Sequence, residues 1–336
     1  MKEAMLYSRR PDGSVECFLC HHRCVIRPGH AGFCSVRENR DGALYTLVYR
    51  RLIAGHIDPI EKKPLFHFHP GSSSYSIATP GCNFRCIFCQ NFSISQMPRD
   101  DGQIEGADVS PQEIAAQAVA NRCDSISYTY TEPTIFMEYA YDVGRLAREA
   151  GLKNVWVSNG YMTPEALDLI GPYLDAINVD LKSFSAETYR KMMGARLDGV
   201  LETLKLFRPR NIWLEVTTLV VPGMNDGDDE LQQIAEFVAA LGSEVPWHVS
   251  RFHPDYQMDD RGATPVGALE RAVEIGRRAG LKYVYAGNIP GSLNEHTYCP
   301  SCGKAVIERV GFSIKRYDLE RGKCRHCQTP IDGVGL

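Results

Sequence analysis

Short runs of buried-type residues alternate with longer amphipathic stretches through most of the chain. The runs are rich in β-branched and aromatic residues, and most of them end at turn or helix-cap residues, which is the pattern of strands. We expect strands at Tyr75–Ala78, Ser125–Tyr130, Val155–Ser158, Ala176–Leu181, Ile212–Val220 and His248–Phe252.

The stretches between these runs predict helices. Ser110, Pro111 and Glu113 combine an N-cap, a first-turn proline and a capping box, and Thr163-Pro164-Glu165 repeats the cap and the proline. Besides a helix from Pro164, we expect helices at Gln112–Asn121, Ile135–Ala150, Glu187–Met193, Val200–Phe207, Glu230–Leu241 and Val266–Ala279. Repeated strand–helix units predict a parallel sheet with right-handed crossovers. Six units suit a doubly wound sheet or most of a (β/α) barrel, and periodicity does not separate the two.

Composition narrows the class of protein. The 336 residues are 44% hydrophobic and 23% charged, which is ordinary for one large globular domain or two modest ones. Lys plus Arg number 37 against 41 Asp plus Glu, and this balance disfavours a strong polyanion binder. No apolar run approaches the ~18 residues of a membrane span, and Met1–Gly13 has no apolar leader-like segment. We therefore expect a cytoplasmic protein without a membrane partner.

The 12 cysteines fall into groups. We call Cys17, Cys20, Cys24 and Cys34 the N-terminal cysteines, Cys82, Cys86 and Cys89 the cysteine triplet, and Cys299, Cys302, Cys324 and Cys327 the C-terminal cysteines. Cytosolic disulfides are disfavoured, so such groups indicate metal or redox chemistry. The expected organisation is a cysteine-rich extension and connector at 1–71, a body at 72–290 and a zinc-ribbon-like module at 291–336.

The cysteine triplet has the spacing C-x3-C-x2-C in the loop after the first body strand. Three thiolates so close together suit three corners of a [4Fe–4S] cluster and leave one iron open for chemistry. The alternatives are a zinc site completed by a distant histidine, and a disulfide with a spare thiol.

This triplet, with Phe88 directly before Cys89, resembles the motif of the radical S-adenosylmethionine (SAM) enzymes. The resemblance implies a partial (β/α)6 barrel, to which the N- and C-terminal cysteines add small cysteine-rich metal-binding extensions. It also implies a [4Fe–4S] cluster whose open iron binds SAM, and reductive cleavage of SAM to a 5′-deoxyadenosyl radical that abstracts hydrogen from a substrate.

The same resemblance implies SAM-binding residues at the carboxyl ends of later strands. Tyr130-Thr131-Glu132-Pro133 resembles a Gly-Gly-Glu-Pro-like run that meets the methionyl amino group, with Tyr130 and Thr131 in place of the glycines. Ser158-Asn159-Gly160 resembles an element near the ribose, and Asp180-Leu181-Lys182 one whose lysine faces the SAM carboxylate. Val220-Val221-Pro222-Gly223 resembles the segment beside adenine. The implied cofactor-binding residues are Phe88, Tyr130, Glu132, Ser158, Asn159, Asp180, Lys182, Val220 and Pro222.

Both terminal groups predict closed metal sites. The C-terminal cysteines form two C-x2-C pairs separated by 21 residues, close to the spacing of a structural Zn2+ ribbon. The N-terminal cysteines suit Zn2+ or an auxiliary [4Fe–4S] cluster, and spacing does not separate the two. Cys123 is expected to be a small buried residue before a strand.

Two further segments carry chemistry-bearing residues. His248, Arg251 and His253, at the end of the last predicted strand, are the candidates for the substrate side. The segment Ile57–Phe68 either lines the barrel mouth or forms a solvated connector; with His56 it supplies Asp58, Glu61, Lys62, Lys63 and His67.

Across nearly the whole chain the sequence resembles the pyruvate formate-lyase activating enzyme-like branch, and within it the AmmeMemoRadiSam system enzymes. This implies a flavodoxin- or ferredoxin-type electron donor, Memo-like and AMMECR-like partners, and a protein or small-molecule substrate. One alternative is an activase that installs a glycyl radical. Another is a non-catalytic zinc-ribbon protein that binds nucleic acid or protein, since residues 1–40 and 299–336 each carry +3. We expect those charges to offset metal thiolates instead, and expect no nucleic-acid partner.

Overall fold

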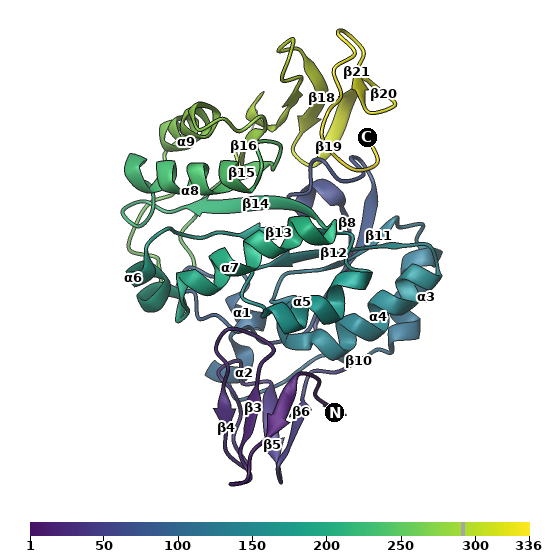
Figure 1. The fold of residues 1–336 in the computed structure, drawn as a ribbon, viewed down its shortest axis with the longest axis vertical. Helices are drawn as coiled ribbons and strands as arrows, with labels where there is room; N and C mark the ends of the chain where they lie inside the picture. Colours follow the sequence, from purple (N-terminus) through teal and green to yellow (C-terminus); the bar gives the residue numbers. More distant parts are fainter. Residues whose placement is uncertain (290–292) are drawn as a thin grey trace.

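The computed structural model describes residues 1–289 and 293–336, and its centre is one eight-stranded sheet (Figure 1). The strand order is β16-β15-β14-β13-β12-β11-β9-β8, and all neighbours are parallel except β8 and β9. The strands are β8 (Ala54–Pro59), β9 (Ser73–Ala78), β11 (Ser125–Tyr128), β12 (Lys153–Ser158), β13 (Ala176–Asp180), β14 (Trp213–Val220), β15 (Trp247–Arg251) and β16 (Val284–Gly287). The predicted α/β class with a parallel sheet is confirmed.

Helices connect successive parallel strands and cover the sheet (Figure 1). They are α3 (Pro111–Ala120), α4 (Met137–Glu149), α5 (Pro164–Ile170), α6 (Ala186–Thr188), α7 (Leu197–Phe207), α8 (Asp228–Leu241) and α9 (Val266–Arg278). Two short helices, α1 (Phe92–Ser95) and α2 (Met97–Asp100), follow the cysteine triplet. The end strands β8 and β16 do not pair with each other, so the sheet is open, as a partial barrel requires.

The predicted helix caps are present. The Ser110 hydroxyl accepts a hydrogen bond from the Glu113 backbone N–H at 3.2 Å, and the Glu113 carboxylate accepts one from the Ser110 backbone N–H at 2.7 Å. Thr163 caps α5 by accepting from the Ala166 backbone N–H at 3.2 Å. These contacts satisfy N–H groups that the first turn of a helix leaves free, so they set where α3 and α5 begin.

The main differences from the elements predicted for the central sheet and its helices are two divided helices and two additional strands. The predicted helix at Ile135–Ala150 divides into the 3-10 turn η2 (Pro133–Phe136) and α4, and Glu187–Met193 is α6 followed by the π-turn η4 (Tyr189–Met193). Strands β16 and β8 were not predicted. β16 has only four residues, and β8 exposes much of its side-chain surface, so neither produces a clear period-2 pattern. β8 forms through its backbone pairing with β9.

The two cysteine-rich extensions lie at opposite ends of the molecule (Figure 1). The N-terminal one contains the sheets β1-β6-β5 and β2-β3-β4, and the C-terminal one contains β17-β18-β19 and β20-β21. Their strands are β1 (Lys2–Glu3), β2 (Tyr7–Arg9), β3 (Val15–Cys17), β4 (Val25–Ile26), β5 (Arg37–Arg40), β6 (Ala43–Thr46), β17 (Thr297–Tyr298), β18 (Ala305–Val310), β19 (Ser313–Tyr317), β20 (Leu319–Glu320) and β21 (Lys323–Cys324); β7 (Arg51–Leu52) pairs with β10 (Ala107–Asp108). Of the predicted domain limits, 71/72 leaves β8 outside the body although it extends the central sheet, and 290/291 lies outside the described residues.

Segment 60–68, including the 3-10 turn η1 (Ile60–Lys62), joins the sheet to the C-terminal module. Phe66 packs in one buried cluster with Tyr283, which directly precedes β16, and with Tyr285 of β16. Val306 and Ile307 of β18 belong to the same cluster. This apolar contact attaches the module to the amino-terminal end of the barrel strands. No helix within the described residues is long and apolar enough to cross a bilayer.

Candidate functional site

A cavity of about 500 Å3 opens at the carboxyl ends of the parallel strands. Loops at this end of an open parallel sheet commonly form ligand sites, because successive strands direct their ends to one place. The predicted residues that line it are Cys82, Cys86, Phe88, Cys89, Tyr130, Glu132, Ser158, Asn159, Asp180 and Lys182. They come from four successive parallel strands, β9, β11, β12 and β13, and the loops that follow them.

The cysteine triplet lies on the loop after β9, at the wall of this cavity. Cys82 Sγ accepts from the Phe84 backbone N–H at 3.3 Å, and Cys89 Sγ lies 3.3 Å from the Ser95 hydroxyl. Burial raises the pKa of the Cys82 and Cys86 thiols, to about 12 for Cys86, so the metal-free thiols hold their protons. Metal binding must therefore displace those protons, which couples loading of the site to pH.

Glu132 connects the ends of β11 and β12. Its side chain is buried, and its carboxylate accepts hydrogen bonds from the Ser158 hydroxyl at 2.8 Å and the Asn159 backbone N–H at 2.8 Å. The backbone N–H and hydroxyl of Thr134 donate to the same carboxylate. Burial raises the pKa of Glu132, although these hydrogen bonds oppose the rise. The carboxylate thus holds the Ser158–Asn159 backbone in place beside the cysteine triplet.

Asn159 and Lys182 extend this arrangement. The Asn159 side-chain amide donates to the Asn83 side-chain oxygen at 2.7 Å and lies 3.9 Å from Cys82 Sγ. Lys182 Nζ donates to Asp180 at 2.6 Å. Burial lowers the pKa of Lys182, but Asp180 and Cys86 outweigh burial and raise it, so the ammonium stays charged at the cavity wall. A cation in this position suits an anionic group of a bound cofactor.

Tyr130 has a left-handed backbone at φ 63°, a conformation that glycine adopts readily and other residues rarely. The Asn91 side-chain amide donates to its carbonyl at 2.8 Å, and its own hydroxyl donates to Asp58. The backbone shape expected of a glycine-containing run therefore exists here with a tyrosine in place of glycine.

Only part of the segment predicted to line the barrel mouth or to form a connector reaches the cavity. Lys62 and Lys63 line the cavity, and Asp58 accepts from both lysines at 2.8 and 2.6 Å. Burial lowers the pKa of Lys63 to about 8, against the effect of Asp58. Burial raises the pKa of Asp58, but the hydrogen bonds from Lys62, Lys63 and Tyr130 outweigh it and hold that pKa well below its usual range. Glu61 and His67 are buried and are not among the described residues that line the cavity.

Five predicted residues lie elsewhere. The carbonyl oxygens of Val220 and Pro222 accept from Thr264 at 2.5 Å and Arg261 at 2.9 Å. Arg251 donates to the Thr264 carbonyl at 2.8 Å, and His253 is exposed. His248 is buried, with Nε2 2.6 Å from Glu215. None of these five is among the described residues lining the cavity, so their predicted roles stay predictions.

Several lining residues were missed by the sequence reasoning. Thr217 and Leu219 of β14 and Ser250 of β15 line the cavity, as do Gln90, Asn91 and Ser95 after the triplet and Asn288 after β16. Strand alternation could have found Ser250, because it lies on the same face as His248 but two residues nearer the carboxyl end.

The C-terminal cysteines lie together in the way that four ligands of one metal ion would. Their Sγ atoms all lie within 4.8 Å of one another, with Cys299 and Cys327 3.5 Å apart and Cys302 and Cys324 3.8 Å apart. The N-terminal cysteines surround a separate small cavity. Cys123 is buried before β11.

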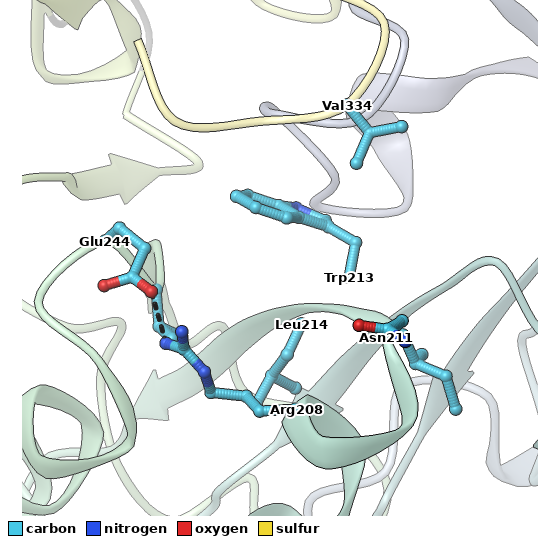
Figure 2. Close-up of a pocket in the computed structure, with 8 residues that line it drawn as sticks. Arg208, Asn211, Trp213, Leu214, Glu244 and Val334 are labelled. Atoms are coloured by element: carbon cyan, nitrogen blue, oxygen red, sulfur yellow. Dashed lines mark ion pairs between the residues drawn. The ribbon is translucent and has the colours of Figure 1, made fainter. Parts of the chain in front are cut away.

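A further cavity of about 220 Å3 lies at the other end of β14 (Figure 2). Trp213 and Val334 stand on one side of it, and the ion pair between Arg208 and Glu244 lies on the other. The described lining of this cavity includes no cysteine or histidine.

Comparison with known proteins finds relatives of this chain. The family model described as the Radical SAM superfamily matches residues 76–238. The uncharacterized protein MJ0808 of Methanocaldococcus jannaschii is 47% identical over 337 residues, covering 99% of this chain and 100% of the relative. Pyruvate formate-lyase 1-activating enzyme of Escherichia coli K12 is 22% identical over 61% of this chain and 89% of its own length. The structure of Streptococcus suis SuiB bound to S-adenosylmethionine matches the fold with a TM-score of 0.50 and 14% identity, over 68% of this chain and 53% of that one.

Proposed function

The chain belongs to the radical SAM superfamily, and from that membership we propose that it abstracts hydrogen from a protein residue or from a substrate presented by a partner protein. The observation that carries the proposal is the cysteine triplet on the loop after β9, facing a cavity built by the carboxyl ends of the next strands. Of the described residues lining that cavity, only these three are cysteines, which suits a cluster with one iron open.

When bound together, the cluster and SAM supply a 5′-deoxyadenosyl radical that takes a hydrogen atom from the substrate. This chain's own residues bind and orient. The cysteine triplet would hold the cluster, and Lys182 would face the SAM carboxylate. Glu132 would act as a positioning residue, because it holds Ser158 and Asn159 where the ribose is expected. Lys62 and Lys63 at the mouth are candidates for contact with the substrate.

The C-terminal metal site, the electron donor and the partner proteins belong to the same proposal. Four sulfurs about 2.3 Å from one Zn2+ lie about 3.8 Å apart, and the close C-terminal cysteines fit that arrangement, so we assign them a structural Zn2+. A flavodoxin- or ferredoxin-type donor would supply electrons in the cytoplasm. The resemblance to AmmeMemoRadiSam enzymes supports Memo-like and AMMECR-like partners.

A second candidate is an activase that installs a glycyl radical. It is favoured by the similarity to the Escherichia coli activating enzyme and by 25% identity over 178 residues to a putative glycyl-radical enzyme activating enzyme of M. jannaschii. Incubation of the reduced enzyme with a candidate partner separates the two, because an activase produces a glycyl radical visible by electron paramagnetic resonance (EPR).

The decisive experiment is anaerobic reconstitution with iron and sulfide, followed by SAM and dithionite. We expect 5′-deoxyadenosine from the wild type and none above background from C86A. C123A is the matched control, because Cys123 is a buried cysteine away from the cavity, and it should retain activity. An iron-loaded wild type that forms no 5′-deoxyadenosine would contradict the proposal.

A further inference from the structure

The N-terminal cysteines line a small enclosed cavity of their own. Its remaining wall is mostly apolar and includes Leu19, Ile26, Phe33 and Ile135. Cys17 ends β3, Cys24 directly precedes β4, and Cys20 and Cys34 lie between strands, so the four thiols converge on one space that is distinct from the cavity lined by the cysteine triplet. Convergence of this kind suits a ligand that can bind all four sulfurs.

The spread of the sulfurs discriminates between ligands. Within residues 1–289 and 293–336, the C-terminal cysteines form the one group whose ligand atoms all lie within 4.8 Å, and no three N-terminal thiols meet that limit. The cysteine triplet does not meet it either. One Zn2+ needs sulfurs about 3.8 Å apart. In a cubane cluster each thiolate binds a different iron, so the sulfurs lie farther apart. The N-terminal cysteines thus resemble the triplet rather than the C-terminal set.

Arg37 supplies an independent observation. It is only 1% exposed and lines the same cavity, and its terminal nitrogens donate to the Glu138 carboxylate at 3.0 and 3.4 Å. Its Nε has no hydrogen-bond partner although it is buried. A buried donor without an acceptor destabilises the fold, and cluster sulfurs accept such N–H groups. The backbone N–H of Phe33 already donates to Cys24 Sγ at 3.5 Å.

The N-terminal cavity also adjoins the triplet loop. His22, which lines it, has Nε2 2.8 Å from the Asn83 carbonyl oxygen. Gly81 lies at φ 104°, and a Cβ there would meet Val36 at 2.7 Å and the Cys34 carbonyl at 3.6 Å. The N-terminal cavity therefore lies against residues 81–83, which include Cys82 of the triplet.

We propose that the N-terminal cysteines bind a second [4Fe–4S] cluster through all four thiolates. A cluster so bound has no open iron and cannot bind SAM, so its chemistry is limited to one-electron transfer and to holding the extension against the triplet loop. The proposal does not depend on whether the enzyme cleaves SAM.

Metal analysis of anaerobically reconstituted full-length protein tests it. We expect about eight iron atoms and one zinc per wild-type chain, and about four irons, about four sulfides and one zinc in C82A/C86A/C89A. That variant should retain the Mössbauer and EPR spectra of a [4Fe–4S] cluster. C20A/C24A should lose about four irons and keep one zinc, and its retained zinc reports a folded C-terminal module.

Two zincs per chain, with no iron or sulfide in C82A/C86A/C89A, would overturn the proposal. The triple variant leaves the N-terminal extension intact, so this measurement decides the matter even where C20A/C24A fails to fold. Loss of 5′-deoxyadenosine formation without change in these ratios would count against the proposed function alone.

Discussion

At the scale of single residues, Glu132 is the side chain on which the cavity geometry depends most. It is 2% exposed, and its carboxylate accepts from the end of β12 and from its own turn. A buried carboxylate with this many donors is stable only while those donors remain paired, because an unpaired buried group costs about 1–3 kcal/mol.

We expect E132Q to weaken SAM binding about tenfold, which corresponds to about 1.4 kcal/mol. The amide places an NH2 group where the carboxylate accepts from Ser158 or from the Asn159 backbone, and those groups move. Equilibrium binding of SAM to the reconstituted protein measures the effect, with iron content unchanged. E105Q, an exposed Glu→Gln variant, is the control, and equal affinity in both would contradict the assignment.

Tyr130 has a left-handed backbone conformation, which is unfavourable for tyrosine. Hydrogen bonds made by its hydroxyl and its carbonyl oxygen stabilise that conformation. We expect Y130F to reduce the free energy of unfolding by about 1 kcal/mol, because it removes the hydrogen bond to Asp58 and leaves the left-handed backbone. Urea unfolding of the metal-free protein measures it. Y317F, at a more exposed tyrosine, should change little, and a neutral Y130F would show that the hydroxyl contact does not stabilise the fold.

At the scale of elements, β14 and β15 are joined to segment 60–68 through Glu215. The backbone N–H groups of Phe66 and His67 donate to its carboxylate at 3.0 and 2.8 Å, and Trp213 Nε1 donates at 3.0 Å. His248 completes the set, so four donors from three parts of the chain converge on one buried carboxylate. His248 is therefore held in the protein interior by Glu215 and does not line the cavity.

We expect E215Q to destabilise the protein by about 3 kcal/mol, because the amide can no longer accept from every donor. Chemical denaturation with all three metal sites loaded gives the value. E236Q on α8 is an exposed control that should lie within about 0.5 kcal/mol of the wild type. A similarly small effect for E215Q would mean that the donors find other partners.

At the scale of the whole molecule, His67 links the barrel to the C-terminal segment. Its Nδ1 lies 2.6 Å from the Asp332 carbonyl oxygen and its Nε2 lies 2.5 Å from the Tyr285 hydroxyl. Burial lowers the pKa of His67 to about 4, although Glu215 opposes the shift. The folded protein therefore holds His67 neutral at pH values where an unfolded chain, with a pKa of about 6.5, takes up a proton.

The sign of the pH dependence follows. Between about pH 6.5 and 4 the unfolded state binds the extra proton, so stability falls as pH falls, by up to about 1.4 kcal/mol per pH unit from this group. We expect H67Q to be less stable at pH 7 but to show a shallower fall across that window. Unfolding free energies measured at several pH values test this, with H253Q as the exposed control; equal slopes would contradict it.

Removal of metal from the C-terminal cysteines should destabilise the C-terminal module and leave the cavity lined by the cysteine triplet unchanged. Cys299 and Cys324 belong to the buried cluster that includes Phe66 and Tyr285, so loss of the metal loosens that contact. We expect C302S/C327S to lower Tm and to become sensitive to proteolysis beyond residue 296, while iron at the triplet is retained. Loss of the triplet iron together with the zinc would show that the two ends are coupled.

The sequence alone determined much of this protein. Strand and helix periodicity identified six of the parallel strands, the caps of α3 and α5, and the class of fold. The sequence also placed the triplet, Glu132, Ser158, Asp180 and Lys182 at or after the carboxyl ends of strands, and these residues line one cavity. These features are local, because a period, a cap or a cysteine spacing is written within a few consecutive residues.

Other features were decided only by the tertiary structure. β8 exists through pairing with β9, Tyr130 takes a glycine-like conformation because Asp58 and Asn91 hold it, and His248 points to Glu215 rather than to the cavity. The N-terminal cysteines have a spacing that fits zinc or a cluster equally. The proposal of a cluster rests instead on their distances and on the unpaired Nε of Arg37 beside them, which depend on contacts between segments far apart in the chain.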